Sequence, residues 1–142
     1  MIKISNNLTI SAGLIIINSK KEILLIKPTG LEKGQFSLPK GIKNKNEDLK
    51  SAALRETKEE IGLEFNLNEL GTQYVINYFN KDVLTKRCFC YLVKLNPERE
   101  GKLSFNYQQE EVEYCDFYSK EEANELIFWR YKELLKINDI WK

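Results

Sequence analysis

Four charged side chains within six residues could do chemistry in this chain. Arg55 and Glu56 are followed by Glu59 and Glu60, in a segment whose apolar spacing predicts a helix. At about 100° per residue, Glu56 and Glu60 fall within the apolar sector of that helix, and Glu59 lies at its edge. The apolar members of the sector are Leu49, Ala52, Ala53 and Leu63. The carboxylates therefore continue the face that the helix turns inward.

A carboxylate that faces inward costs free energy unless it is paired, protonated or bound to a metal ion. Because Glu56 and Glu60 are four residues apart, their carboxylates can converge. A divalent cation would remove their repulsion, and ligation by oxygen alone suits Mg²⁺ or Mn²⁺. The alternative is a solvated, charged surface helix, which is the usual explanation of a charge run. The apolar sector favours the metal site.

The segment from residue 41 to residue 63 resembles the signature of the Nudix hydrolases, G-x5-E-x7-R-E-U-x-E-E-x-G-U, where U is a bulky aliphatic residue. The matching positions are Gly41, Glu47, Arg55, Glu56, Glu59, Glu60, Gly62 and Leu63. Thr57 departs from the pattern at the first U position but keeps a methyl group for packing. A match with fixed spacing over the whole segment is a specific signal.

The resemblance implies that water attacks a diphosphate with the help of a bound metal ion. It makes Glu56 and Glu60 the metal ligands, together with the carbonyl group of Gly41. Glu59 is then a candidate base, or a ligand through water, and Glu56 and Glu59 are the catalytic candidates of the helix. Arg55 would orient a glutamate and pair with Glu47 across the loop, in a structural role.

Two further glutamates, Glu110 and Glu111, precede a predicted strand. Related enzymes draw a further metal ligand or general base from this place, and the spacing to the strand favours Glu110 as the catalytic candidate. The alternative is a pair of solvated loop charges, because loops are polar in any case.

Residues 36 to 41, Phe-Ser-Leu-Pro-Lys-Gly, resemble the entry to the signature in the asymmetrical diadenosine tetraphosphate hydrolases, where tryptophan is commoner than Phe36. Lys40 would place a cation beside the metal site. Tyr78 falls where those hydrolases carry a tyrosine that stacks on adenine, and Lys86 where a basic residue meets phosphates. The alternatives are a solvated Lys40 and a Tyr78 that only packs in the sheet.

The resemblance therefore predicts asymmetrical cleavage of diadenosine tetraphosphate to ATP and AMP, with a nucleotide or dinucleoside polyphosphate as the partner. An RNA 5′-pyrophosphohydrolase uses the same core and is the alternative enzyme. RNA is therefore a possible substrate, but no other role for RNA is expected. Diphosphoinositol polyphosphates are a third substrate class, but they call for a more basic pocket. A domain that senses a nucleotide without cleaving it is the alternative outside enzymes. Such domains usually lose signature glutamates, and all are present here.

Composition limits the remaining choices. The 142 residues, 42% hydrophobic and 30% charged, suit one soluble globular domain over residues 1–142. A net charge of +1 implies no strong field for nucleic acid or membrane, and the apolar runs are too short to span a bilayer. The absence of histidine removes histidine triads and most zinc sites. Cys88, Cys90 and Cys115 lack metal-type spacing, which favours core packing in a reducing cytoplasm.

The elements that must position these residues alternate between strands and helices. Strands are predicted at residues 10–17, 22–27, 70–79, 84–95 and 111–117, with loops at 28–35 and 41–46. Helices are predicted at about 48–61, ending at Gly62, and from a capping box at Ser119 to about Lys136. This order predicts an α/β fold with a mixed sheet between helices. The Nudix resemblance implies the same α/β/α sandwich.

Overall fold

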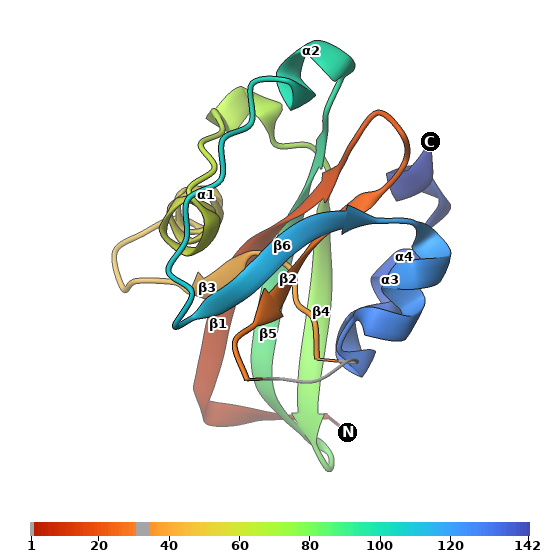
Figure 1. The fold of residues 1–142 in the computed structure, drawn as a ribbon. Coiled ribbons are helices and arrows are strands. Elements are labelled where there is room, and N and C mark those ends of the chain that lie inside the picture. The colour runs from red at the N-terminus through yellow and green to blue at the C-terminus, as the bar shows by residue number, and fades with distance from the viewer. Residues whose placement is uncertain (1, 31–34) are drawn as a thin grey trace.

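A mixed β-sheet of six strands runs through the computed structural model, which describes residues 2–30 and 35–142 (Figure 1). Its strands are β1 (Lys3–Ile17), β2 (Ile23–Pro28), β3 (Lys40–Ile42), β4 (Gln73–Asn80), β5 (Val83–Lys94) and β6 (Val112–Tyr118). Their order across the sheet is β4-β5-β1-β2-β6, and β3 pairs with β1. β1 and β5 run parallel, whereas the other pairs are antiparallel. Residues 31–34 of the loop predicted at 28–35 lie outside the described residues.

Helix α1 (Leu49–Ile61) begins and ends where the sequence predicts. The side chain of Asp48 caps its first turn by accepting a backbone hydrogen bond at 2.8 Å. Gly62 follows the last turn in the left-handed conformation, with φ at 79°, and so stops the helix. Thr57, the departure from the family pattern, is fully buried, and its hydroxyl donates to the Ala53 carbonyl at 2.8 Å. The substitution therefore leaves no unsatisfied polar group.

The C-terminal segment is not the single helix that the sequence predicts to reach Lys136. Helix α3 (Lys120–Leu126) ends early, because the Phe36 N–H donates to the Leu126 carbonyl and the Phe128 N–H donates to the Phe36 carbonyl. The elements that follow are η2 (Trp129–Tyr131), α4 (Lys132–Leu135) and η3 (Asn138–Trp141). Of the six residues expected on the inner side of the predicted helix, Ala123, Ile127, Tyr131, Leu134 and Leu135 are buried, whereas Leu126 is only partly buried.

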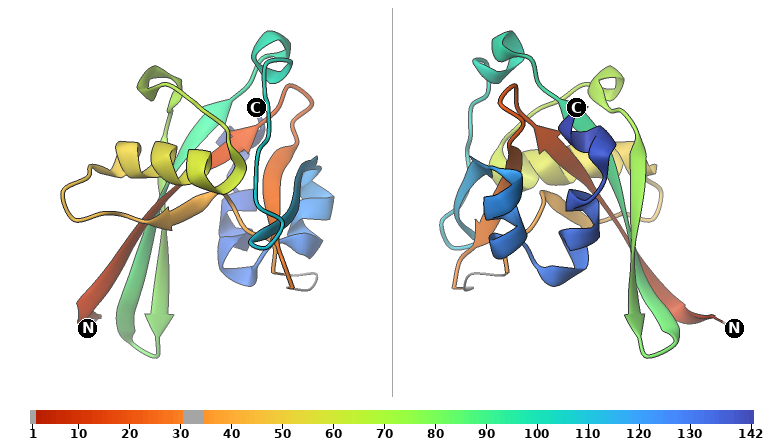
Figure 2. Two further views of the ribbon diagram at one scale, coloured as in Figure 1. Left: turned by 60° about the vertical axis from the view of Figure 1, so that its left-hand side comes forward. Right: turned by 90° about the vertical axis from the view of Figure 1, so that its right-hand side faces the viewer.

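Helices cover both faces of the sheet (Figures 1 and 2). α1 packs on the face formed by Ala12, Leu14 and Ile16 of β1, whereas α3 and α4 pack on the face of Ile15 and Ile17. This arrangement confirms the predicted α/β/α sandwich. The remaining short helices are η1 (Leu67–Glu69) and α2 (Pro97–Glu100). Among the described residues, no helix is long and apolar enough to cross a membrane.

The start of the predicted loop at 41–46 is instead strand β3. Residues Lys40–Ile42 pair with Ser11–Gly13 at the middle of β1. Gly13 permits this contact, since a Cβ atom there would lie 2.5 Å from the Pro39 carbonyl oxygen. The pairing fixes the entry to the signature segment against the centre of the sheet.

Candidate active site

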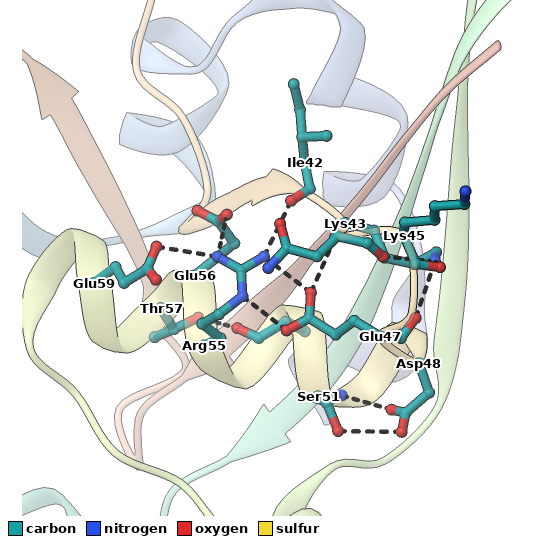
Figure 3. A network of polar contacts seen from close by, with 12 residues as sticks. Ile42, Lys43, Lys45, Glu47, Asp48, Ser51, Arg55, Glu56, Thr57 and Glu59 are labelled. Carbon is teal, nitrogen blue, oxygen red and sulfur yellow. Dashed lines mark hydrogen bonds and ion pairs between the residues drawn. The ribbon is translucent and has the colours of Figure 1, made fainter.

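Arg55 joins the signature loop to helix α1 (Figure 3). Its Nε and Nη2 atoms donate to the two carboxylate oxygens of Glu47 at 2.7 and 2.9 Å, and Nη2 also donates to the Ile42 carbonyl at 3.1 Å. Its Nη1 donates to Glu56 at 2.8 Å and to Glu59 at 3.0 Å. The guanidinium lowers the pKa of the Glu47 carboxyl group. One side chain therefore holds the loop and two signature carboxylates.

Glu56 lies directly against Gly41. A Cβ atom on Gly41 would come within 2.0 Å of the Glu56 Oε2 atom. No side chain fits at residue 41 while the Glu56 carboxylate keeps this position. The structure thus brings the backbone of Gly41 and one predicted metal ligand into contact.

Glu60 is the most strongly perturbed acid of the signature. Burial raises the pKa of its carboxyl group to about 7, and the negative charges of Glu56 and Glu111 add to this shift. The positive charge of Lys40 acts in the opposite direction, and the Lys40 backbone N–H donates to Glu60 Oε1 at 3.3 Å. The charges of Glu56 and Glu111 therefore both oppose ionisation of the buried Glu60 carboxyl group.

The donor set fits a hard divalent cation in chemical type. Glu56, Glu60 and the Gly41 carbonyl offer oxygen alone, and buried carboxylates that repel one another gain from a cation between them. As the described side chains stand, no three acidic, histidine or cysteine residues are gathered closely enough to hold a metal ion. Arg55 occupies the Oε1 atom of Glu56, so a cation would bind the other oxygen or compete with this ion pair.

A cavity of about 360 Å³ lies between the signature loop and the C-terminal elements. It collects residues from distant parts of the chain, and its polar and aromatic lining includes Lys40, Glu60, Tyr78, Lys86, Glu111, Phe128 and Tyr131. All three predicted substrate-binding residues, Lys40, Tyr78 and Lys86, are among them. Glu56 and Glu59 lie outside this lining, and Glu59 is 59% exposed.

The glutamate before β6 that reaches the cavity is Glu111. The sequence favours Glu110, and both glutamates are exposed, but Glu110 does not line the cavity. A turn decides between them, since the N–H groups of Glu111 and Val112 both donate to the Gln108 carbonyl. Spacing alone cannot predict how this turn orients two neighbouring side chains. The geometry places Glu111, rather than Glu110, beside Glu60.

Tyr78 and Lys86 face each other across β4 and β5. They are paired residues of the two strands, and the Lys86 ammonium lies 4.9 Å from the centre of the Tyr78 ring. The Tyr78 hydroxyl contacts that of Tyr131, and the Arg130 guanidinium lies 5.0 Å from the same ring. Tyr78 therefore lines the cavity with much of its ring already in contact with protein.

Two lysines give the cavity a positive end. Burial lowers the pKa of Lys86, and the neighbouring charge of Lys40 lowers it further. Among the described residues, no carboxylate forms an ion pair with either ammonium group. Two like charges without a carboxylate partner favour the binding of an anion.

Sequence reasoning missed the C-terminal contribution to this site. Phe128 and Tyr131 line the cavity, and Arg130 covers the Tyr78 ring. The sequence predicts Tyr131 only as an inward-facing core residue of the C-terminal helix. The aromatic and basic run from Phe128 to Tyr131 was the available signal, but its contact with β4 depends on the break after α3.

A family model of the NUDIX domain matches residues 7–136, and the chain therefore belongs to the Nudix family. Nudix hydrolase 2 of Arabidopsis thaliana is 28% identical over 130 residues, which cover 89% of this chain and 45% of that protein. An RxLR effector protein of Phytophthora infestans is 49% identical over 57 residues, which cover 38% of this chain and 21% of that protein. The chain thus spans less than half the length of these curated relatives.

Solved structures share the fold over most of the chain. A MutT protein from Methanosarcina mazei Go1 superposes with a TM-score of 0.72 at 20% identity and covers 91% of each chain. A C. elegans Ap4A hydrolase, in a binary complex, superposes with a TM-score of 0.69 at 25% identity and covers 90% of this chain and 93% of that one. Both agree with the sheet and helices described above.

Proposed function

We propose that this Nudix domain is a pyrophosphohydrolase that uses Mg²⁺ or Mn²⁺ to hydrolyse a diphosphate linkage in a nucleotide derivative. Its preferred substrate is diadenosine tetraphosphate (Ap4A), cleaved asymmetrically to ATP and AMP. The observation that carries this proposal is the cavity itself, which combines Glu60 and Glu111 with Lys40, Lys86 and Tyr78. Carboxylates for a cation, ammonium groups for phosphates and a ring for a base thus lie around one space.

Glu56, Glu60 and the Gly41 carbonyl are the proposed cation ligands. A divalent cation bound there would neutralise charge on the diphosphate that water attacks. Arg55 holds Glu56 and Glu59 in place through its 2.8 and 3.0 Å hydrogen bonds, and Glu47 anchors Arg55. Glu59 and Glu111 are the two candidate general bases. Of these, Glu111 lines the cavity.

Lys40 and Lys86 are the proposed contacts to the polyphosphate. Their ammonium groups form no ion pair with a described carboxylate, so phosphate oxygens would supply the missing negative charge. Tyr78 is the proposed contact to one adenine. The share of its ring that Lys86 and Arg130 leave open is the part available to the base. The structural likeness to an Ap4A hydrolase at 25% identity supports this substrate class.

The test is a substrate panel with products identified by mass. The protein is incubated with Mg²⁺ or Mn²⁺ and Ap4A, 5′-triphosphorylated RNA or a diphosphoinositol polyphosphate. We expect ATP and AMP from Ap4A at the highest kcat/KM. Much faster turnover of RNA would favour the pyrophosphohydrolase of RNA ends. Tight nucleotide binding without cleavage in the presence of either metal would instead indicate a nucleotide sensor.

A further inference from the structure

We infer that Trp129 binds the second nucleobase of a dinucleoside polyphosphate outside the cavity. This inference rests on the proposed function, because it requires a substrate with a base at each end. The Trp129 residue is 60% exposed, although its neighbour Phe128 lines the cavity. The Phe128 and Trp129 rings are 5.7 Å apart between centroids. An open aromatic surface therefore lies directly beside the proposed substrate site.

Arg130 links the Trp129 ring to the cavity wall. Its guanidinium lies 4.3 Å from the Trp129 ring centre and 5.0 Å from that of Tyr78. The Arg130 Nη2 atom also donates to the Phe79 carbonyl at 3.1 Å, which fixes the side chain against β4. Cation–π contacts of this kind stabilise a ring that packing leaves open. The indole is thus supported on one side by a charge and meets solvent over most of its surface.

The chemistry of this corner fits a base attached to a polyphosphate. Rings of bases stack on exposed aromatic side chains with about 1–3 kcal/mol each. Lys40 and Lys86 supply positive charge within the cavity, and Arg130 supplies it between the Tyr78 and Trp129 rings, as a polyphosphate requires. The Trp129 indole N–H donates no hydrogen bond to any described residue. A mononucleotide would fill the cavity but leave this surface open.

The other tryptophan shows the contrast. Trp141 packs against the core, and its indole N–H donates to the Leu135 carbonyl at 2.9 Å. Its surface and its donor group are thus both used within the protein. The ring of Trp129 is mostly exposed, and its indole N–H has no described acceptor. Trp141 therefore contributes to the fold, whereas Trp129 can bind a base.

The kinetic test compares Ap4A with adenosine 5′-tetraphosphate, which has the same phosphate chain but a single base. Trp129→Ala should raise KM for Ap4A by about 5- to 150-fold, the factor that corresponds to lost stacking. KM for the single-base substrate should not change. Trp129→Phe should recover most of the Ap4A affinity. Leu67→Ala removes another exposed apolar side chain, outside the cavity lining, and should leave both substrates unaffected.

A binding measurement separates this inference from the proposed function. An Ap4A analogue with methylene groups in place of the bridging oxygens resists hydrolysis and should quench tryptophan fluorescence. The quenching should be lost in Trp129→Phe, since only Trp141 then remains. Quenching without Ap4A hydrolysis would reject the proposed reaction but retain the base contact. The inference would be overturned if Trp129→Ala raised KM equally for both substrates. It would also be overturned if KM for Ap4A did not change in Trp129→Ala and quenching did not change in Trp129→Phe.

Discussion

Arg55 and Glu47 form a two-point ion pair across the signature loop, with Nε–Oε2 at 2.7 Å and Nη2–Oε1 at 2.9 Å. Their side chains are only 26% and 15% exposed. Since the same guanidinium holds Glu56 and Glu59, any movement of the loop is transmitted to two carboxylates of α1. We therefore expect Arg55 and Glu47 to affect catalysis by positioning these carboxylates.

Arg55→Ala and Glu47→Ala should each lower both the free energy of unfolding and kcat. In a double-mutant cycle, their effects on stability should not add, because each variant already breaks the same ion pair. Arg99→Ala provides the matched control, since Arg99 pairs with Glu69 at 2.8 Å outside the cavity lining. That variant should lose stability but keep kcat. Strict additivity of the first two variants would remove the proposed coupling.

Glu60→Gln should lower kcat by at least about 100-fold at saturating Mg²⁺, because a neutral amide cannot stabilise a cation at the diphosphate. The amide oxygen can still accept the Lys40 N–H bond, so the fold should be kept. Circular dichroism and steady-state kinetics measure the two effects. Glu98→Gln, at a side chain that is 80% exposed, should retain full activity. A wild-type rate for Glu60→Gln would refute the assignment.

The raised pKa of Glu60 should appear in the stability of the metal-free protein. The folded chain keeps the Glu60 proton up to about pH 7, whereas the unfolded chain loses it near pH 4.5. Between these values the folded state binds more protons, so this group makes the free energy of unfolding fall as pH rises. The limiting contribution is about 3 kcal/mol.

Denaturant unfolding of wild type and Glu60→Gln at pH 5 and pH 8, with chelator, measures this contribution. The difference between the two proteins removes the effects of all other titrating groups. Glu60→Gln should gain stability relative to wild type at pH 8 but much less at pH 5. A difference that is independent of pH would mean that Glu60 titrates normally in the folded protein.

Gly41→Ala should impair activity more than stability. The new methyl group would meet the Glu56 carboxylate at 2.0 Å, and the flexible end of that side chain must move away. We expect a large fall in kcat with a melting temperature close to that of wild type. Gly101→Ala is the matched control, because its nearest contacts would be at an ordinary 3.6 Å. Full activity of Gly41→Ala would show that Glu56 need not lie at this backbone.

Glu111→Gln and Glu110→Gln separate two neighbouring candidates for the same role. Both residues are exposed in the turn before β6, but Glu111 lines the cavity and its charge raises the pKa of Glu60, whereas Glu110 is not part of the lining. Glu111→Gln should therefore lower kcat by about 10²-fold or more, as expected for loss of general base catalysis or of a ligand. Glu110→Gln should stay near wild type. The opposite result, read from kcat at several pH values, would restore Glu110 as the catalytic candidate.

The sequence by itself determined helix α1 and the face that it turns inward. Asp48 and Gly62 bound the helix through local capping, and Ala52 and Ala53 of the predicted apolar sector are buried. Such signals act within a few residues, so they can be read along the chain. The same holds for the capping box at Ser119.

Only the tertiary structure decided which distant residues meet. The backbone hydrogen bonds of Phe36 with Leu126 and Phe128 end the predicted C-terminal helix early. The turn before β6 places Glu111, rather than Glu110, in the cavity lining with Glu60. The helix break has no local signal, because it depends on hydrogen bonds between segments that are far apart in the sequence. The orientation of Glu111 has none either, because it depends on the exact path of one turn. Apolar residues recur at the helical period on both sides of the break after α3. The periodicity of the sequence therefore could not predict that the helix ends there.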